Sequence, residues 1–161
     1  MSNDQNKVVQ NLQYECNHYS CFSKPKINLD MNKRNLVVGA ILGVLAIILG
    51  AFGSHGLKSL IDLEAQNTFE VGVRYQMYHA LFLLSVGSIK IMSQNAQKII
   101  RYLVLFGVIL FSGSIYGLAT NELSSFDFKV IGFITPIGGL LLILAWLVLL
   151  INLLKMKRDK S

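Results

Sequence analysis

The sequence predicts an all-α membrane protein, with four transmembrane helices and a short amphipathic helix on the outer side of the membrane. Charged residues make up only 15% of the chain and hydrophobic residues 53%, whereas soluble domains contain about 25% charged residues. Long stretches also lack Asp, Glu, Lys and Arg, and an apolar stretch of about 18 residues can cross a bilayer as a helix. The expected spans are residues 35–54, 75–92, 102–121 and 130–154. The second reaches this length only because Lys90 can extend its ammonium group towards water.

The chain divides into a polar tail, residues 1–30, and a four-helix transmembrane domain, residues 31–161. The tail lacks helical periodicity, so we expect it to be disordered. Basic residues and an apolar stretch follow Met31, as at a natural start, and the alternative is that translation begins there. Cys16 and Cys21 both lie in the tail and supply too few ligands for a metal site, so none is expected.

The first span carries small residues at helical spacing, including Gly39, Gly43 and Gly50. Small faces let helix backbones approach closely in lipid, where hydrophobicity does not drive helix association. We expect this face to pack against other helices of the same chain, with homodimerisation as the alternative. The glycines expected at helix contacts are Gly39, Gly43, Gly50, Gly53, Gly56, Gly113 and Gly117.

The link after the first span has apolar residues at helical spacing over residues 57–66, which predicts the short amphipathic helix. Asn67 predicts the start of a new helix, because Glu70 follows three residues later as in a capping box. Glu70 and Arg74 are four residues apart and are expected to pair.

The fourth span combines a proline with a long Leu/Ile-rich remainder. Pro136 predicts a kink in the outer half of the span, because proline lacks a backbone donor and clashes with the preceding turn. The Leu/Ile-rich part is expected to face lipid. Trp146 lies well inside the span and is expected to be a packing residue.

Charge alternates between the links. Basic residues gather before the first span, around the second link and after the last span: Lys24, Lys26, Lys33, Arg34, Lys90, Lys98, Arg101, Lys155, Lys157, Arg158 and Lys160. This is the positive-inside pattern, which places both termini in the cytoplasm of a plasma-membrane protein. The basic ends are expected to meet anionic lipid headgroups. Basic and aromatic residues are not interleaved, so nucleic acid is not expected as a partner.

Six polar residues stand out near the outer ends of spans one and two: His55, Arg74, Tyr75, Gln76, Tyr78 and His79. Polar groups at membrane depth are costly and indicate either a specific internal partner or a function. The favoured interpretation is structural, with Gln76 and His79 bonded to facing helices. The alternatives are a pocket for a lipid headgroup or small ligand, and a haem or metal site shared by His55 and His79.

Several catalytic signatures are missing from the sequence. The spans contain no Asp or Glu, which argues against a cation-coupled transporter built on a membrane carboxylate. The chain has no phosphate loop and no dinucleotide fingerprint. We therefore expect neither an enzyme nor a cofactor.

Two stretches resemble a known family: GAFGSHGLKSL, and TFEVGVRYQMYHALFLL shortly after it. They are similar to the signature of domain of unknown function 423, also called uncharacterised protein family 0382, whose bacterial members are related to transmembrane protein 256. The resemblance implies a four-helix membrane protein with no assigned activity. The predicted function is therefore a non-enzymatic membrane component that interacts with lipid, with a second copy or with a partner membrane protein. The alternative is a small transporter or channel component whose outer vestibule is the polar cluster.

Overall fold

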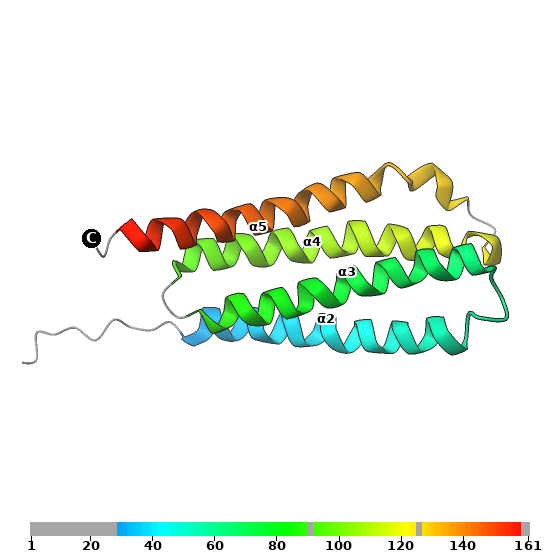
Figure 1. Ribbon diagram of the computed structural model, residues 1–161, viewed down its shortest axis with the longest axis horizontal. Coiled ribbons are helices and arrows are strands. Elements are labelled where there is room, and N and C mark those ends of the chain that lie inside the picture. The colour runs from blue at the N-terminus through cyan, green and yellow to red at the C-terminus, as the bar shows by residue number, and fades with distance from the viewer. Residues whose placement is uncertain (1–28, 90–91, 125–126, 159–161) are drawn as a thin grey trace, which may run out of the picture.

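The computed structural model describes residues 29–89, 92–124 and 127–158. These residues form four long helices, α2 (Leu29–His55), α3 (Leu63–Ser88), α4 (Gln94–Ala119) and α5 (Ile134–Arg158), with the 3-10 helices η1 (Asn121–Leu123) and η2 (Phe128–Ile131) between α4 and α5. Successive long helices run in opposite directions, so the start of α2 and the end of α5 lie at the same end of the bundle (Figure 1). We call this the basic end and the opposite one the far end. The all-α prediction is confirmed, whereas nearly all of the tail predicted over residues 1–30 lies outside the described residues.

The outer surface of the bundle is apolar. Large hydrophobic side chains are exposed along α2 (Val37, Ile41, Val44, Leu45, Ile47, Ile48, Phe52) and along α5 (Ile137, Leu140, Ile143, Leu144, Leu147, Leu150, Ile151, Leu153, Leu154). Such a surface is unfavourable in water and suits hydrocarbon. Three segments are long and apolar enough to cross a membrane, namely Lys33–His55, Gln94–Ala119 and Ile134–Lys155. The chain is therefore a membrane protein, and the last helix presents its Leu/Ile-rich side outwards as predicted.

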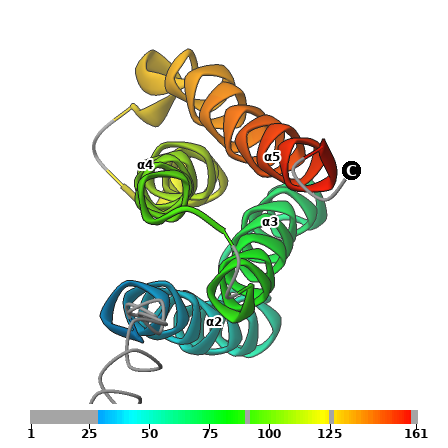
Figure 2. The ribbon, with the colours of Figure 1, turned by 90° about the vertical axis from the view of Figure 1, so that its left-hand side faces the viewer.

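Helices α3 and α4 form the centre of the bundle. Helix α2 packs along α3, α5 packs along α4, and α3 contacts α4 (Figure 2). Fully buried side chains along these two central helices include Leu83, Val86, Ile100 and Val104. Trp146 packs as expected: its ring centroid lies 4.3 Å from that of Phe82 on α3, although half of its surface remains exposed.

The small face of α2 packs against α3, as predicted for contact within one chain. A Cβ added at Gly39 would lie 2.9 Å from the carbonyl oxygen of Ala80. The equivalent atom at Gly43 would lie 3.7 Å from the Cβ of Ala80, and at Gly50 it would lie 3.3 Å from Val73. The absence of side chains at these positions lets the two backbones approach closely.

The other glycines predicted at helix contacts differ in what they pack against. Gly53 also packs against α3, but Gly56, which follows the end of α2, faces the Phe52 ring of α2, and Gly117 faces η2. Gly113 was wrongly assigned, because a Cβ there would meet no atom within 4 Å. Further tight contacts lie at Gly107, and at Gly72 and Gly138, which the sequence analysis did not assign to a packing face.

The predicted amphipathic helix over residues 57–66 does not form as a separate element. Residues 57–61 make turns, and α3 starts at Leu63 and continues unbroken through Asn67. Asp62 is the cap: its Oδ1 accepts from the backbone N–H of Ala65 at 2.7 Å. Gln66 then donates to the carbonyl of Ile61 at 3.1 Å, which ties the turns to the first turn of α3. The sequence predicted this helix start at Asn67, five residues further along the chain.

The last two predicted span boundaries also shift. Helix α4 starts at Gln94, where Ser93 caps it, and α5 starts at Ile134 rather than at residue 130. Pro136 therefore lies in the first turn of α5, where backbone N–H groups have no helical partner and proline is tolerated. The kink predicted in the outer half of the span is therefore wrong, because the helix begins only two residues before Pro136.

Candidate polar sites

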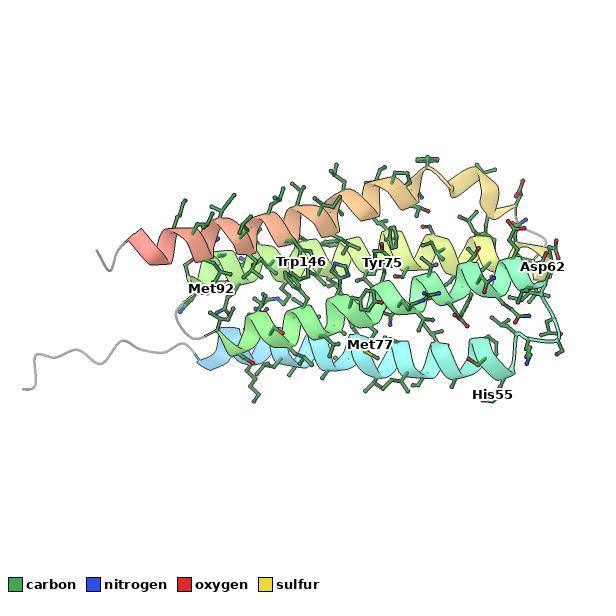
Figure 3. The ribbon with its side chains drawn as sticks, viewed as in Figure 1. His55, Asp62, Tyr75, Met77, Met92 and Trp146 are labelled. Atoms are coloured by element: carbon green, nitrogen blue, oxygen red, sulfur yellow. The ribbon has the colours of Figure 1, made fainter. Side chains whose placement is uncertain are left out.

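The six predicted cluster residues do not form one site. His55 is exposed at the far end of α2, whereas Tyr75 lies near the middle of the bundle (Figure 3). Tyr75 and Tyr78 are 42% and 56% exposed, so both face outwards. Arg74 is exposed and pairs with Glu70 at 3.5 Å, the pair that the sequence predicted.

Gln76 and His79 are the two residues of the six that lie inside the bundle, at 4% and 5% exposure. Because α3 starts at Leu63, His79 lies about 24 Å along the helix from its far-end terminus at 1.5 Å per residue. From the sequence it was expected near the outer end of its span. His55 and His79 are therefore far apart and do not face a common haem or metal position.

Gln76 links three helices. Its Nε2 donates to the backbone carbonyl of Leu42 on α2 at 3.0 Å, and its Oε1 accepts from the hydroxyl of Tyr116 on α4 at 3.0 Å. Both ends of the amide are thus satisfied by neighbouring helices, as predicted for Gln76. The same prediction for His79 is wrong, because its ring bonds to its own helix. A hydrogen bond between membrane helices contributes about 0.6 to 2 kcal/mol.

His79 lies one helical turn from Gln76. Its Nδ1 is 2.8 Å from the carbonyl oxygen of Tyr75, and since a carbonyl accepts, Nδ1 carries the proton and Nε2 presents a lone pair. Nε2 has no partner among the described residues, nor has the hydroxyl of Ser112 on α4. The antiparallel register that pairs Gln76 with Tyr116 also places Ser112 at the level of His79. Between α3 and α4 the core thus holds two unpaired polar atoms at one depth.

A second polar cluster, which sequence reasoning missed, lies at the basic end. Asn35 of α2 is fully buried, and its Nδ2 is 3.4 Å from Oε1 of Gln97 on α4. Arg101, one turn further along α4, donates from Nη1 to Oδ1 of Asn35 at 3.1 Å. Gln97 also donates to the carbonyl of Ile89, which fixes the end of α3. A signal was present in the four-residue spacing of Gln97 and Arg101, but Arg101 was interpreted as a flanking charge.

The chain also resembles known proteins in sequence. Residues 49–139 match the family described as Protein of unknown function (DUF423). A UPF0382 membrane protein of Staphylococcus saprophyticus is 38% identical over 120 residues, which are 74% of this chain and 96% of the relative. The UPF0382 membrane protein YwdK of Bacillus subtilis is 36% identical over 122 residues, covering 74% and 95%.

A third relative is a UPF0382 membrane protein of Haemophilus influenzae, 35% identical over 127 residues that cover 79% of this chain and 98% of that protein. No solved structure matches. The family match and the near full-length relatives agree with the motif resemblance and with the apolar helices. The chain belongs to the DUF423 family, whose relatives here are UPF0382 membrane proteins of uncharacterised function.

Proposed function

We propose that the protein is a non-enzymatic component of the bacterial plasma membrane that acts through contacts with lipid or with a partner membrane protein. The observation that carries this proposal is the position of Gln76. The side-chain amide of Gln76, in the family motif, forms its hydrogen bonds with α2 and α4 and is therefore not free to bind a ligand. The motif therefore builds the scaffold, and the outer surface supplies the contacts.

The proposed topology has four spans with both termini in the cytoplasm. Helices α2, α4 and α5 are apolar enough to cross. Helix α3 is about as long as its neighbours α2 and α4 and runs antiparallel to both (Figure 1). In the proposed topology it therefore crosses the same membrane in the return direction. The exposed cations Lys33, Arg34 and Lys98 lie at the basic end, and the positive-inside rule assigns that end to the cytoplasm.

Flux measurements separate this proposal from the transporter alternative. The purified protein is reconstituted into liposomes, and leakage of a panel of small ions and solutes is compared with that of empty liposomes. We expect no flux above the empty control, because Tyr75 and Tyr78 point outwards and do not line a vestibule. A solute flux that is lost in His79→Ala but retained in Tyr78→Ala would contradict the proposal and favour transport.

A further inference from the structure

An open cleft lies between α2 and α4 at the basic end. Its volume is about 430 Å³, and its lining is Lys33, Arg34, Val37, Val38, Arg101 and Tyr102. Three of these six side chains are cationic and none is acidic. The cleft is therefore a concentrated positive site at the level where the apolar part of α2 begins.

Arg101 is the buried cation of this cleft, only 6% exposed. One of its nitrogens donates to Asn35, and its guanidinium carbon lies 5.3 Å from the ring centroid of Tyr102, so the group is held in place. Among the described residues no carboxylate lies within ion-pair distance of it. A guanidinium has five N–H donors, and a buried one is favourable when a carboxylate or phosphate accepts from it. Among the side chains that the structure describes, the cleft thus holds a buried positive charge and no counter-ion for it.

An apolar groove adjoins the cleft on the other side of Tyr102. It also has a volume of about 430 Å³ and is lined by Ile99, Tyr102, Leu103, Phe106, Leu110 and Leu141. From Tyr102 to Leu110 it follows α4 towards the bilayer centre for about 12 Å at 1.5 Å per residue. Tyr102 belongs to both surfaces, so one elongated ligand can reach both.

We propose that this combined surface binds an anionic phospholipid, with the phosphate headgroup in the cleft and an acyl chain in the groove. The three cations match a phosphate in charge, and Arg101 matches it in hydrogen-bonding geometry. A soluble phosphate would fill the cleft but would gain nothing from the adjoining apolar groove. Basic pockets between membrane helices are suited to anionic headgroups. The inference rests on the proposed function in taking lipid as the partner.

The test is lipid binding to the detergent-purified protein, measured by native mass spectrometry. Titrations with phosphatidylglycerol, phosphatidylcholine of the same chains, and water-soluble glycerol phosphate are compared. The main variant is Lys33→Gln/Arg34→Gln, since both side chains are exposed and the fold does not depend on them. The matched control is Lys98→Gln/Lys155→Gln, which removes two exposed cations at the same end that do not line the cleft. Arg101→Lys and Arg101→Gln, with folding checked by circular dichroism, probe the buried cation.

We expect phosphatidylglycerol to bind in preference to phosphatidylcholine. Loss of Lys33 and Arg34 should weaken this binding about 30-fold, since each cation near a headgroup contributes roughly a factor of five. The control pair should change it less than about twofold. Arg101→Gln should weaken binding more than Arg101→Lys, because lysine keeps the charge.

Three outcomes would overturn the inference. Equal weakening in the two double variants would mean that net charge alone attracts the lipid. Equal binding of the two phospholipids would mean that the site does not distinguish an anionic headgroup from a zwitterionic one. Binding of glycerol phosphate as tight as that of phosphatidylglycerol would assign the cleft to a soluble phosphate. The lipid-binding assay tests only the lipid site, whereas the liposome flux assay tests the proposed function. The two proposals can therefore fail independently.

Discussion

At the scale of single residues, two buried amide side chains connect helices of the bundle. Gln76 joins α3 to α2 and α4 near mid-bundle, and Asn35 joins α2 to α4 at the basic end. The hydrophobic effect does not hold helices together in lipid, so packing and interhelical hydrogen bonds take its place. A small number of well-placed amides therefore has a large share in defining the arrangement.

Gln76→Leu is expected to lower the free energy of unfolding by about 1 to 2 kcal/mol, because two hydrogen bonds are lost and the Tyr116 hydroxyl is left unpaired. Tyr116→Phe should cost about 0.5 to 1 kcal/mol for the single bond. The measurement is reversible unfolding in mixed detergent micelles, followed by circular dichroism. The double variant should cost less than the sum of the two, since both remove one shared bond. Strict additivity would show that the two side chains do not interact.

At the scale of elements, helix starts and close contacts distinguish the observed structure from the sequence prediction. Asp62 caps α3 and Asn67 lies inside the helix, whereas the sequence predicted that the helix would start at Asn67. Gly138 of α5 faces the backbone of α4, while Gly113 of α4 faces open space. Each case provides a pair of substitutions in which one residue is the control for the other.

Asp62→Ala should destabilise the protein by about 1 kcal/mol, because the N–H of Ala65 loses its acceptor. Asn67→Ala should be neutral or slightly stabilising, since alanine has the higher helix propensity and Asn67 is exposed. Thermal unfolding in detergent compares the two variants directly. A larger loss of stability in Asn67→Ala than in Asp62→Ala would indicate that the helix starts at Asn67, as the sequence predicted.

Gly138→Ala should destabilise by about 1 to 3 kcal/mol, as overpacking does. The added Cβ would lie 2.8 Å from the Cα of Phe111 and even closer to its backbone nitrogen, so α4 and α5 must move apart. Gly113→Ala adds the same methyl group where no atom lies within 4 Å, and should be neutral or stabilising by up to about 1 kcal/mol. Equal effects in the two variants would indicate that α5 does not pack on α4 at Phe111.

At the scale of the whole molecule, the two ends of the bundle differ in charge while the middle is apolar. The far end carries the acidic residues Asp62, Glu64 and Glu122 among its exposed groups, and the basic end carries the exposed cations already named. This asymmetry favours one orientation in the membrane. In the orientation proposed above, the cleft around Arg101 would lie beside the cytoplasmic leaflet, whose anionic lipids attract basic residues.

The topology is tested by cysteine labelling in a Cys16→Ser/Cys21→Ser background. A membrane-impermeant maleimide added to intact cells should label Lys58→Cys and Glu122→Cys, both exposed at the far end. It should label Asn95→Cys, at the basic end, only after the membrane is permeabilised. Labelling of Asn95→Cys together with Lys58→Cys in intact cells would show that α3 does not cross. The reversed pattern would show the opposite orientation.

The fold class, the family and the approximate positions of three membrane-length helices could be predicted from the sequence. These depend on quantities summed along one stretch of chain, such as length, hydropathy and charge, and on the motif. The sequence also identified the small face of α2 and the structural use of Gln76, since repeated glycines and a polar group at membrane depth each require a close neighbour.

Which residues of different helices contact one another could be known only from the tertiary structure. It placed His79 far from His55, brought Arg101 to Asn35, and turned Gly113 outwards. These outcomes depend on where α3 begins and on the register between antiparallel helices. A shift of a few residues at Asp62 moves every later residue of α3 to a different depth, and one residue along a helix turns a side chain by about 100°. The candidate lipid surface follows from this register, because its cations come from two helices that are distant in the sequence.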